Sequence, residues 1–188
     1  SKGDVIFLLD SDDAFLKNKV KYFIEIFKKK SELEFIQDYP IYFYPDNLKK
    51  ERRTIKSKKF IFHTWPYFNP TSTMVFRRNF LKKLLSEIKF SNKKFKKMFF
   101  DARAIIYIYF FSDKYLMSRK YLTIYTQNDK GDTINNYGKK NFNWWKRRLE
   151  YHKFVESLFA KNNKYYNKFL DYYLTLIINK IYKLFGKT

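Results

Sequence analysis

The sequence contains no cysteine, shows no secretory-signal pattern and has no apolar run long enough to cross a membrane. The absence of cysteine excludes disulfide scaffolds and cysteine-based zinc or thiol chemistry, and it fits a reducing compartment. The longest uncharged stretches, such as residues 104–112, are far shorter than the ~20 apolar residues of a transmembrane helix. We therefore expect a cytoplasmic protein.

Acidic residues are scarce, with 18 Asp and Glu against 40 Lys and Arg, so the formal net charge is +22. Such a field attracts polyanions, acidic membrane surfaces or phosphorylated substrates. The lysines are spread along the whole chain, however, and the enrichment in Lys, Asn, Ile, Phe and Tyr also fits A/T-rich coding. The net charge alone therefore does not identify a binding partner.

Apolar residues are plentiful, at 45% of the chain with 22% aromatic, which is enough for a packed core. Disordered chains lack this apolar surface. A length of 188 residues suits one domain with a small appendage. Because the chain starts without Met and a strand-like run follows almost at once, we expect it to be a piece of a longer protein.

The first thirty residues have the pattern of an α/β unit. Residues 5–9 form a continuous apolar run, typical of a parallel strand covered on both faces. An acidic turn follows, and then residues 16–29 place their apolar side chains on one face of a helix. Strand, turn and helix in succession favour the α/β class.

The remainder alternates short predicted elements. Strands are expected at residues 34–37 and 41–44, divided by Pro40, and at 71–76, 115–117 and 121–125. Helices are expected around 81–88 and at 100–111, with a loop or short helix at 47–59 and a charged connection at 92–97. Residues 127–140 are polar and turn-rich, which predicts a boundary. We therefore expect one domain at 1–126 and a helical extension at 127–188, with helices at 143–160 and 164–185.

The acidic turn carries the sharpest chemical signal. Asp10, Asp12 and Asp13 crowd the end of a buried strand, where carboxylates repel one another unless a cation or hydrogen-bond donors compensate. Ligand sites in open α/β sheets lie at this edge. Oxygen ligands suit Mg²⁺ or Mn²⁺, and such an ion can bridge the phosphates of a nucleotide. In the alternative interpretation the acids only cap the next helix.

The opening segment resembles a known family. Residues 1–13, SKGDVIFLLDSDD, are similar to the A-x-G-D-x-I-x-F-L-D-S-D-D segment of family-2 glycosyltransferases with the GT-A fold, whose acidic cluster is the DXD motif. The resemblance implies that Asp12 is the main metal ligand. It also implies that Asp10 helps to hold the ion or the ribose and diphosphate of the donor, and that Asp13 is an auxiliary ligand.

Three further segments match the family in order. Residues 69–78, NPTSTMVFRR, resemble its s-s-x-v-x-R-r strand near the acceptor side. Residues 99–103, FFDAR, are similar to a later E-D or W-x-D element whose Asp is the general base, which would be Asp101, although Phe100 replaces the Glu of many relatives. Residues 121–125 resemble an L-x-x-Y-R strand, with Thr126 in place of Arg. The resemblance covers residues 1–126.

This resemblance implies a partial GT-A, Rossmann-like domain that lacks its N-terminal βαβ units, and therefore weak donor binding by this chain alone. The implied activity is inverting, metal-dependent transfer of a sugar from a nucleotide-sugar donor, a UDP-sugar, to a hydroxyl group. The implied acceptor is a glycan or a lipid-linked saccharide in polysaccharide biosynthesis.

The predicted C-terminal helices add candidate binding residues. Arg147 and Arg148 have the geometry to clamp a diphosphate bidentately. His152 is either a metal ligand or, more commonly for such a residue, part of a packed helix face. The last helix combines apolar residues with lysines, so it either lies on an acidic membrane surface at the cytoplasmic face or packs as an ordinary core helix.

Two rival functions stay open. Charge and abundant aromatics suggest a nucleic-acid-binding protein, but the lysines form no compact patch, so we expect no nucleic-acid partner. A phosphotransferase with Asp10 as nucleophile is the second rival, weakened because Ala14 stands where such enzymes favour Thr or Val.

Overall fold

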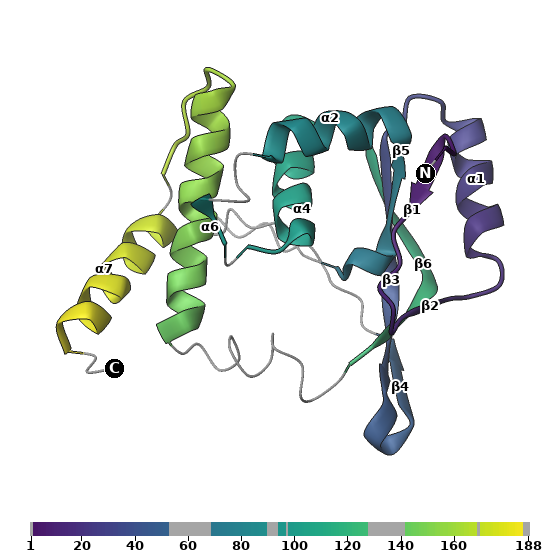
Figure 1. Cartoon of the computed structure of the whole chain (residues 1–188), viewed down its shortest axis with the longest axis horizontal. Coiled ribbons are helices and arrows are strands. Elements are labelled where there is room, and N and C mark those ends of the chain that lie inside the picture. Colours follow the sequence, from purple (N-terminus) through teal and green to yellow (C-terminus); the bar gives the residue numbers. More distant parts are fainter. Residues whose placement is uncertain are drawn as a thin grey trace. The chain divides into compact units, whose positions relative to one another are not determined.

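The computed structural model describes residues 2–52, 69–89, 94–96, 98–127, 142–168 and 170–185, and these have a mixed α/β architecture. The chain divides into two compact units (Figure 1). Unit 1 comprises Ser1–Lys56, Tyr67–Lys89 and Phe100–Asn128. Unit 2 comprises Ser57–Pro66, Phe90–Phe99 and Asp129–Thr188. Residues 92, 93 and 97 of the predicted connection and residues 128–140 of the turn-rich segment lie outside the described residues.

Unit 1 is built on a six-stranded mixed sheet in the order β1-β5-β3-β6-β2, with β4 paired to β3. Its strands are β1 (Val5–Phe7), β2 (Ala14–Phe15), β3 (Phe35–Tyr44), β4 (Lys49–Arg52), β5 (Met74–Arg77) and β6 (Tyr115–Thr126). Only β3 and β6 run parallel, and the other pairs among these strands are antiparallel.

The opening strand differs from its prediction. β1 is three residues long, half-buried, and pairs antiparallel with β5 through a register that sets Val5 opposite Arg77. The expectation of a parallel strand covered on both faces is therefore wrong for this pairing. A short apolar run indicates a buried strand but carries no information about the direction of its neighbour, which depends on how distant segments connect.

In two places, two short strands were predicted where the structure has one long strand. The strands expected at 34–37 and 41–44 merge in β3, and those expected at 115–117 and 121–125 merge in β6. Pro40 does not divide β3, because it falls between the residues paired with β5, which end at Gln37, and those paired with β4, which start at Ile41. The ladder to β6 also shifts register on both sides of Tyr39. A proline is tolerated at such an irregularity, where the ladder does not need its missing N–H. The predicted loop or short helix at 47–59 begins instead with the end of a 3₁₀ turn, Pro45–Asn47, and with β4, and its residues 53–59 lie outside the described residues.

Helices cover both faces of the sheet. Figure 1 shows α1 (Lys19–Lys29) on one face, and α2 (Arg78–Ile88) and α4 (Phe100–Phe111) on the other. On the α1 side, Phe23 and Phe27 pack with Ile36 and Val75 in one cluster. On the α2 side, the Phe76 ring lies 4.9 Å from that of Phe35. Alternate residues of β3 and β5 thus serve opposite faces, as the period of a strand dictates.

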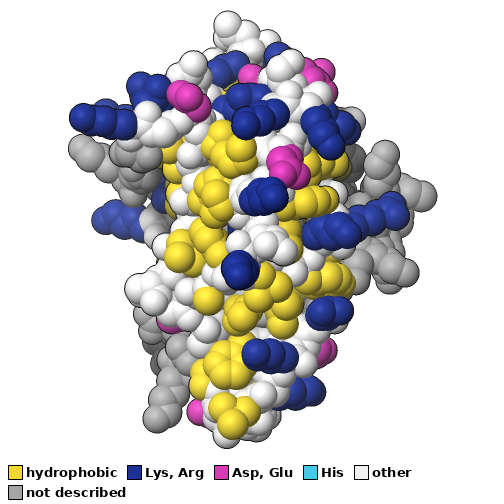
Figure 2. All heavy atoms as spheres, turned by 90° about the vertical axis from the view of Figure 1, so that its right-hand side faces the viewer, with side chains coloured by type: hydrophobic (Ala, Val, Ile, Leu, Met, Phe, Trp, Pro, Cys, Tyr) yellow, Lys and Arg dark blue, Asp and Glu magenta, His cyan; other side chains and the backbone are white. Residues whose placement is uncertain are grey.

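The surface on the α1 side mixes apolar and basic side chains. Figure 2 shows hydrophobic side chains down the middle of this view, with Lys and Arg both among them and along the margins, and few acidic groups. The spread of cations agrees with the even distribution of lysines along the sequence. On this view the positive charge therefore forms no single compact patch.

Unit 2 contains α6 (Phe142–Lys161) and α7 (Leu170–Phe185), which pack side by side (Figure 1). Both helices were predicted, but α7 begins six residues later than expected. The Phe95 ring packs edge-on against Phe154 of α6 at 5.6 Å. Among the described helices, none is both long enough and apolar enough to span a membrane.

Candidate functional site

The acidic turn after β1 is fixed through its backbone by two distant segments. The Asp10 amide donates to the Ser72 hydroxyl at 2.9 Å, and the Asp13 amide donates to the Asp10 carbonyl at 3.1 Å. From the end of β6, the Thr126 amide donates to Asp13 Oδ1 at 2.8 Å and the Thr126 hydroxyl donates to the Asp12 carbonyl at 2.5 Å. The turn is therefore held in one conformation by residues from opposite parts of unit 1.

The three carboxylates of the turn differ in exposure. Asp10 and Asp12 are exposed, whereas Asp13 is partly buried. Burial raises the pKa of Asp10, and the neighbouring charge of Asp12 adds to this rise. The Oδ2 atom of Asp13 is buried and makes no hydrogen bond to the described residues.

Asp13 experiences opposing influences on its ionisation. Burial raises the pKa of Asp13 most, and Asp12 and Asp10 raise it further, whereas the Ser72 hydroxyl and the Thr126 amide lower it. The net direction is upward. Burial and the neighbouring carboxylates thus disfavour the charged form of Asp13 more than the local donors favour it, and a cation placed at the turn would favour ionisation.

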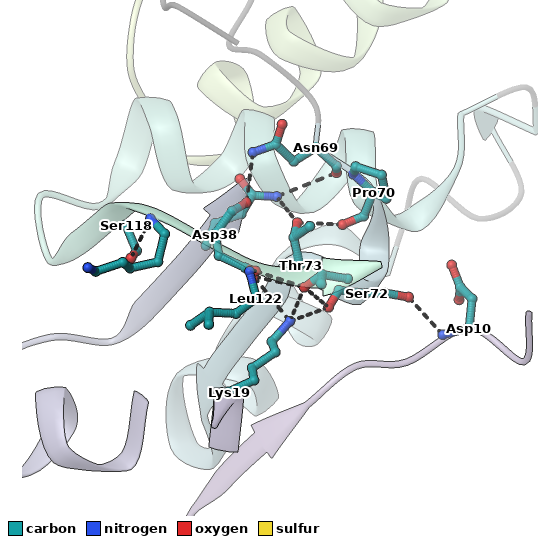
Figure 3. Close-up of polar contacts among 12 residues, drawn as sticks. Asp10, Lys19, Asp38, Asn69, Pro70, Ser72, Thr73, Ser118 and Leu122 are labelled. Carbon is teal, nitrogen blue, oxygen red and sulfur yellow. Dashed lines mark hydrogen bonds and ion pairs between the residues drawn. The ribbon is translucent and has the colours of Figure 1, made fainter. Parts of the chain in front are cut away.

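A buried ion pair lies beneath the turn (Figure 3). Lys19 and Asp38 are both fully buried, and their Nζ and Oδ1 atoms are 3.1 Å apart. Lys19 Nζ also donates to the Ser72 carbonyl at 2.6 Å and to the Thr123 hydroxyl at 2.5 Å. The Lys19 ammonium lies 4.2 Å from the centre of the Phe15 ring. It is therefore enclosed by acceptors and by the rings of Phe15 and, at 5.9 Å, Phe23.

Asp38 is equally well satisfied. It accepts hydrogen bonds from the Leu122 amide at 3.0 Å and from the Thr123 hydroxyl at 2.8 Å. Burial lowers the pKa of Lys19 and raises that of Asp38, while the attraction between the two charges opposes both shifts. Such a pair persists only with complete hydrogen bonding, because desolvation of each ion is costly.

Sequence reasoning missed this buried pair, although one signal was present. Lys19 stands four and eight residues before Phe23 and Phe27, which places its side chain on the buried face of α1. Asp38 follows Gln37 within a largely apolar strand. A charge on an apolar face predicts a buried partner, but it does not say which residue that partner is.

A second polar cluster fixes the segment that leads into β5. The Asn69 amide group donates to the Asp38 carbonyl at 3.1 Å, and Gln37 Nε2 donates to the Thr73 hydroxyl at 2.9 Å. The Thr73 hydroxyl in turn donates to the Pro70 carbonyl at 2.6 Å. Residues 71–73 are therefore a buried 3₁₀ turn and not the start of a strand as predicted. This turn carries Ser72, which supports the acidic turn.

Tyr125 connects the acidic turn electrostatically to Asp101. Burial raises the pKa of Tyr125 to about 12, and the charges of Asp13, Asp12 and Asp101 contribute to the rise. Asp101 lies in the first turn of α4, where its Oδ1 accepts a hydrogen bond from the Ala102 amide at 2.7 Å. Three of the carboxylates that sequence analysis singled out in unit 1, Asp12, Asp13 and Asp101, thus contribute to the raised pKa of this phenol, whereas Asp10 does not.

The other candidate residues belong to unit 2. Arg148 forms an ion pair with Asp171 at 2.5 Å, and His152 Nε2 lies 3.0 Å from the other oxygen of the same carboxylate. Arg147 stacks over the Phe99 ring at 4.8 Å. Both guanidinium groups therefore make contacts within unit 2, and the diphosphate clamp stays a prediction. His152 is buried on the helix face, as its packed interpretation expected.

Comparison with known proteins gives no assignment. No known protein-family model matches the sequence, and no curated protein matches it. The function must therefore be argued from the residues and their geometry.

Proposed function

We propose that this chain carries the metal-binding and acceptor side of a glycosyltransferase, which moves a sugar from a nucleotide-sugar donor to a hydroxyl acceptor with inversion. The observation that carries the proposal is the acidic turn itself. Its backbone is held by Ser72 and Thr126, while Asp10 and Asp12 remain accessible to solvent. The family resemblance of residues 1–126 supports the same conclusion independently of the contacts.

The donor atoms of the turn suit Mg²⁺ or Mn²⁺. These are hard cations that prefer oxygen, and Mg²⁺ in particular is held by one or two carboxylates together with water and substrate phosphates. Among the described residues, no three His, Asp or Glu side chains form a group that could hold an ion by themselves. Asp12 and Asp10 would therefore supply only part of the coordination, and water and substrate phosphates would supply the rest.

The acidic turn and Asp101 would have separate roles in the reaction. When bound, the ion would offset the negative charge that develops on the departing nucleoside diphosphate. Asp101 would accept the proton of the acceptor hydroxyl as its oxygen bonds to the anomeric carbon and the bond from that carbon to the diphosphate breaks. Asp12, Asp13 and Asp101 all belong to unit 1, and each contributes to the raised pKa of Tyr125.

Mn²⁺ binding to the full chain, measured by electron paramagnetic resonance in the presence and absence of UDP, tests the proposal. We expect Asp12→Asn to weaken Mn²⁺ binding by about tenfold or more, because a carboxylate ligand and its charge are lost. UDP should tighten Mn²⁺ binding to the unaltered chain. Asp46→Asn, an exposed Asp on the Pro45–Asn47 turn, is the matched control and should change nothing.

Equal Mn²⁺ binding by the Asp12→Asn and unaltered chains would overturn the assignment, whereas a small effect of UDP would agree with the weak donor binding that the resemblance implies. Two further measurements separate the rivals. Steep salt dependence of RNA binding would favour the nucleic-acid-binding interpretation. Covalent trapping of a phosphate analogue on Asp10 would favour a phosphotransferase.

A further inference from the structure

The apolar side chains of α7 form an exposed stripe along the helix. Ile177 and Ile181 are each about half exposed, at 53% and 49%, and Phe185 is 80% exposed. The stripe repeats every three or four residues, which places it on one face of the helix. Its members are Leu170, Tyr173, Leu174, Ile177, Ile181, Leu184 and Phe185. A contiguous apolar patch of this kind marks a surface that contacts something other than water.

The opposite face of α7 is polar and buried, so the helix cannot turn its stripe inward without breaking polar contacts. Asp171, Thr175 and Asn179 are the buried residues, spaced four apart. Asp171 contacts Arg148 and His152, and Asn179 Nδ2 donates to the Trp145 carbonyl at 2.9 Å. These contacts to α6 fix the rotation of α7 with its apolar face outward.

Two exposed lysines lie in the last turns of α7, Lys180 at the edge of the stripe and Lys183 further round the helix. Lys180 and Lys183 are exposed, and they precede Ile181 and Leu184 in the last turns of the helix. Tyr165, in the connection before α7, is 89% exposed. Exposed Tyr with nearby Lys is typical of segments that lie at the boundary between lipid headgroups and acyl chains.

We propose that α7 docks in the plane of an anionic lipid bilayer, with the stripe inserted at the headgroup boundary and Lys180 and Lys183 on the anionic headgroups. Apolar insertion and attraction to acidic lipid are the two contributions that hold an amphipathic helix at a membrane surface. A second copy of the chain fits less well, because each copy carries a net charge of +22 and the copies would repel. The proposal does not depend on the transferase activity.

Flotation of the full chain with lipid vesicles tests this docking. We expect binding to mixed phosphatidylcholine–phosphatidylglycerol vesicles and much weaker binding to phosphatidylcholine alone. The Leu174→Gln/Ile177→Gln variant should lose about tenfold or more of this affinity. Lys180→Gln and Lys183→Gln should each lose about fivefold on the anionic vesicles. Val20→Gln, which alters an exposed apolar residue of α1, is the control and should bind normally.

The substituted side chains are exposed, so circular dichroism should show the same helix content in each variant. Vesicle binding that is unchanged by the Leu174→Gln/Ile177→Gln substitutions would overturn the proposal. So would the absence of binding to anionic vesicles. Self-association in sedimentation equilibrium that the same double substitution abolishes, without vesicle binding, would assign the stripe to a second copy instead.

Discussion

Helices α1 and α7 are both amphipathic, yet they present opposite faces to their neighbours. The buried residues of α1 are Lys19, Phe23 and Phe27. Those of α7 follow the same spacing of four but are Asp171, Thr175 and Asn179. In α1 the aromatic residues enter the core, whereas in α7 the apolar stripe stays in solvent.

The difference shows that an amphipathic pattern defines two faces of a helix without deciding which one is buried. α1 packs on a sheet whose residues Ile36 and Val75 are apolar, so burying Phe23 removes apolar surface from water. α7 packs on α6 where Arg148 and His152 require a polar partner. The surface against which a helix packs therefore decides which of its two faces is buried.

The largest expected effect comes from emptying the core under α1. Phe23→Ala should lower the free energy of unfolding by about 4 kcal/mol, because a fully buried aromatic ring leaves a cavity. Ile177→Ala on the stripe of α7 should change it by less than about 0.5 kcal/mol. Urea denaturation of both variants measures the contrast. A cost for Ile177→Ala comparable to that of Phe23→Ala would show that the stripe is buried in solution.

A smaller loss is expected when the buried ion pair is broken. Lys19→Met should cost about 3 kcal/mol, because Asp38 is left as a buried charge with only the Thr123 and Leu122 donors. Lys21→Met, on the exposed face of the same helix, is the control.

The double variant Lys19→Met/Asp38→Leu sharpens this test. Removing both charges should recover much of the stability lost in Lys19→Met, because no uncompensated charge remains. A double variant less stable than Lys19→Met would mean that the pair contributes through packing and not through mutual compensation of charge. Urea midpoints and slopes for the three variants give the comparison.

The smallest effect is a pH dependence at the contact between α6 and α7. Burial lowers the pKa of His152 below 6.5, Asp171 opposes this, and Arg148 lowers it further. The unfolded chain therefore binds a proton that the folded chain does not, so stability falls as pH decreases below about 6.5. Urea unfolding from about pH 8 to about pH 5 measures the decline. His152→Gln should flatten this part of the profile, and an unchanged profile would remove His152 as its source.

Much of the fold could be predicted from periodicity. The helix at Phe100–Phe111 was predicted to the residue, because an apolar run of that length has few alternatives. Residues 34–37 and 41–44 were recognised as extended, but their union across Pro40 was not. The reason is that a proline interrupts a strand only where its partner needs the missing N–H, and the partners were unknown.

The candidate site was only partly visible in the sequence. The carboxylates of residues 10–13 are adjacent in the chain, so their mutual repulsion could be read directly. Ser72 and Thr126 support them from 62 and 114 residues away, and Lys19 of the buried ion pair donates to the Ser72 carbonyl, 53 residues away. The residues next to each of them in the chain do not indicate which distant residue will be the partner.

By itself, the sequence determined the positive charge, the acidic turn and the two faces of each helix, since these follow from residue type and spacing along the chain. Only the tertiary structure decided that β1 runs antiparallel to β5, that Lys19 is buried against Asp38, and that α7 turns its apolar face outward. Each of those outcomes depends on which distant segment comes to lie alongside, because desolvation and hydrogen-bond pairing are properties of contacts and not of single residues.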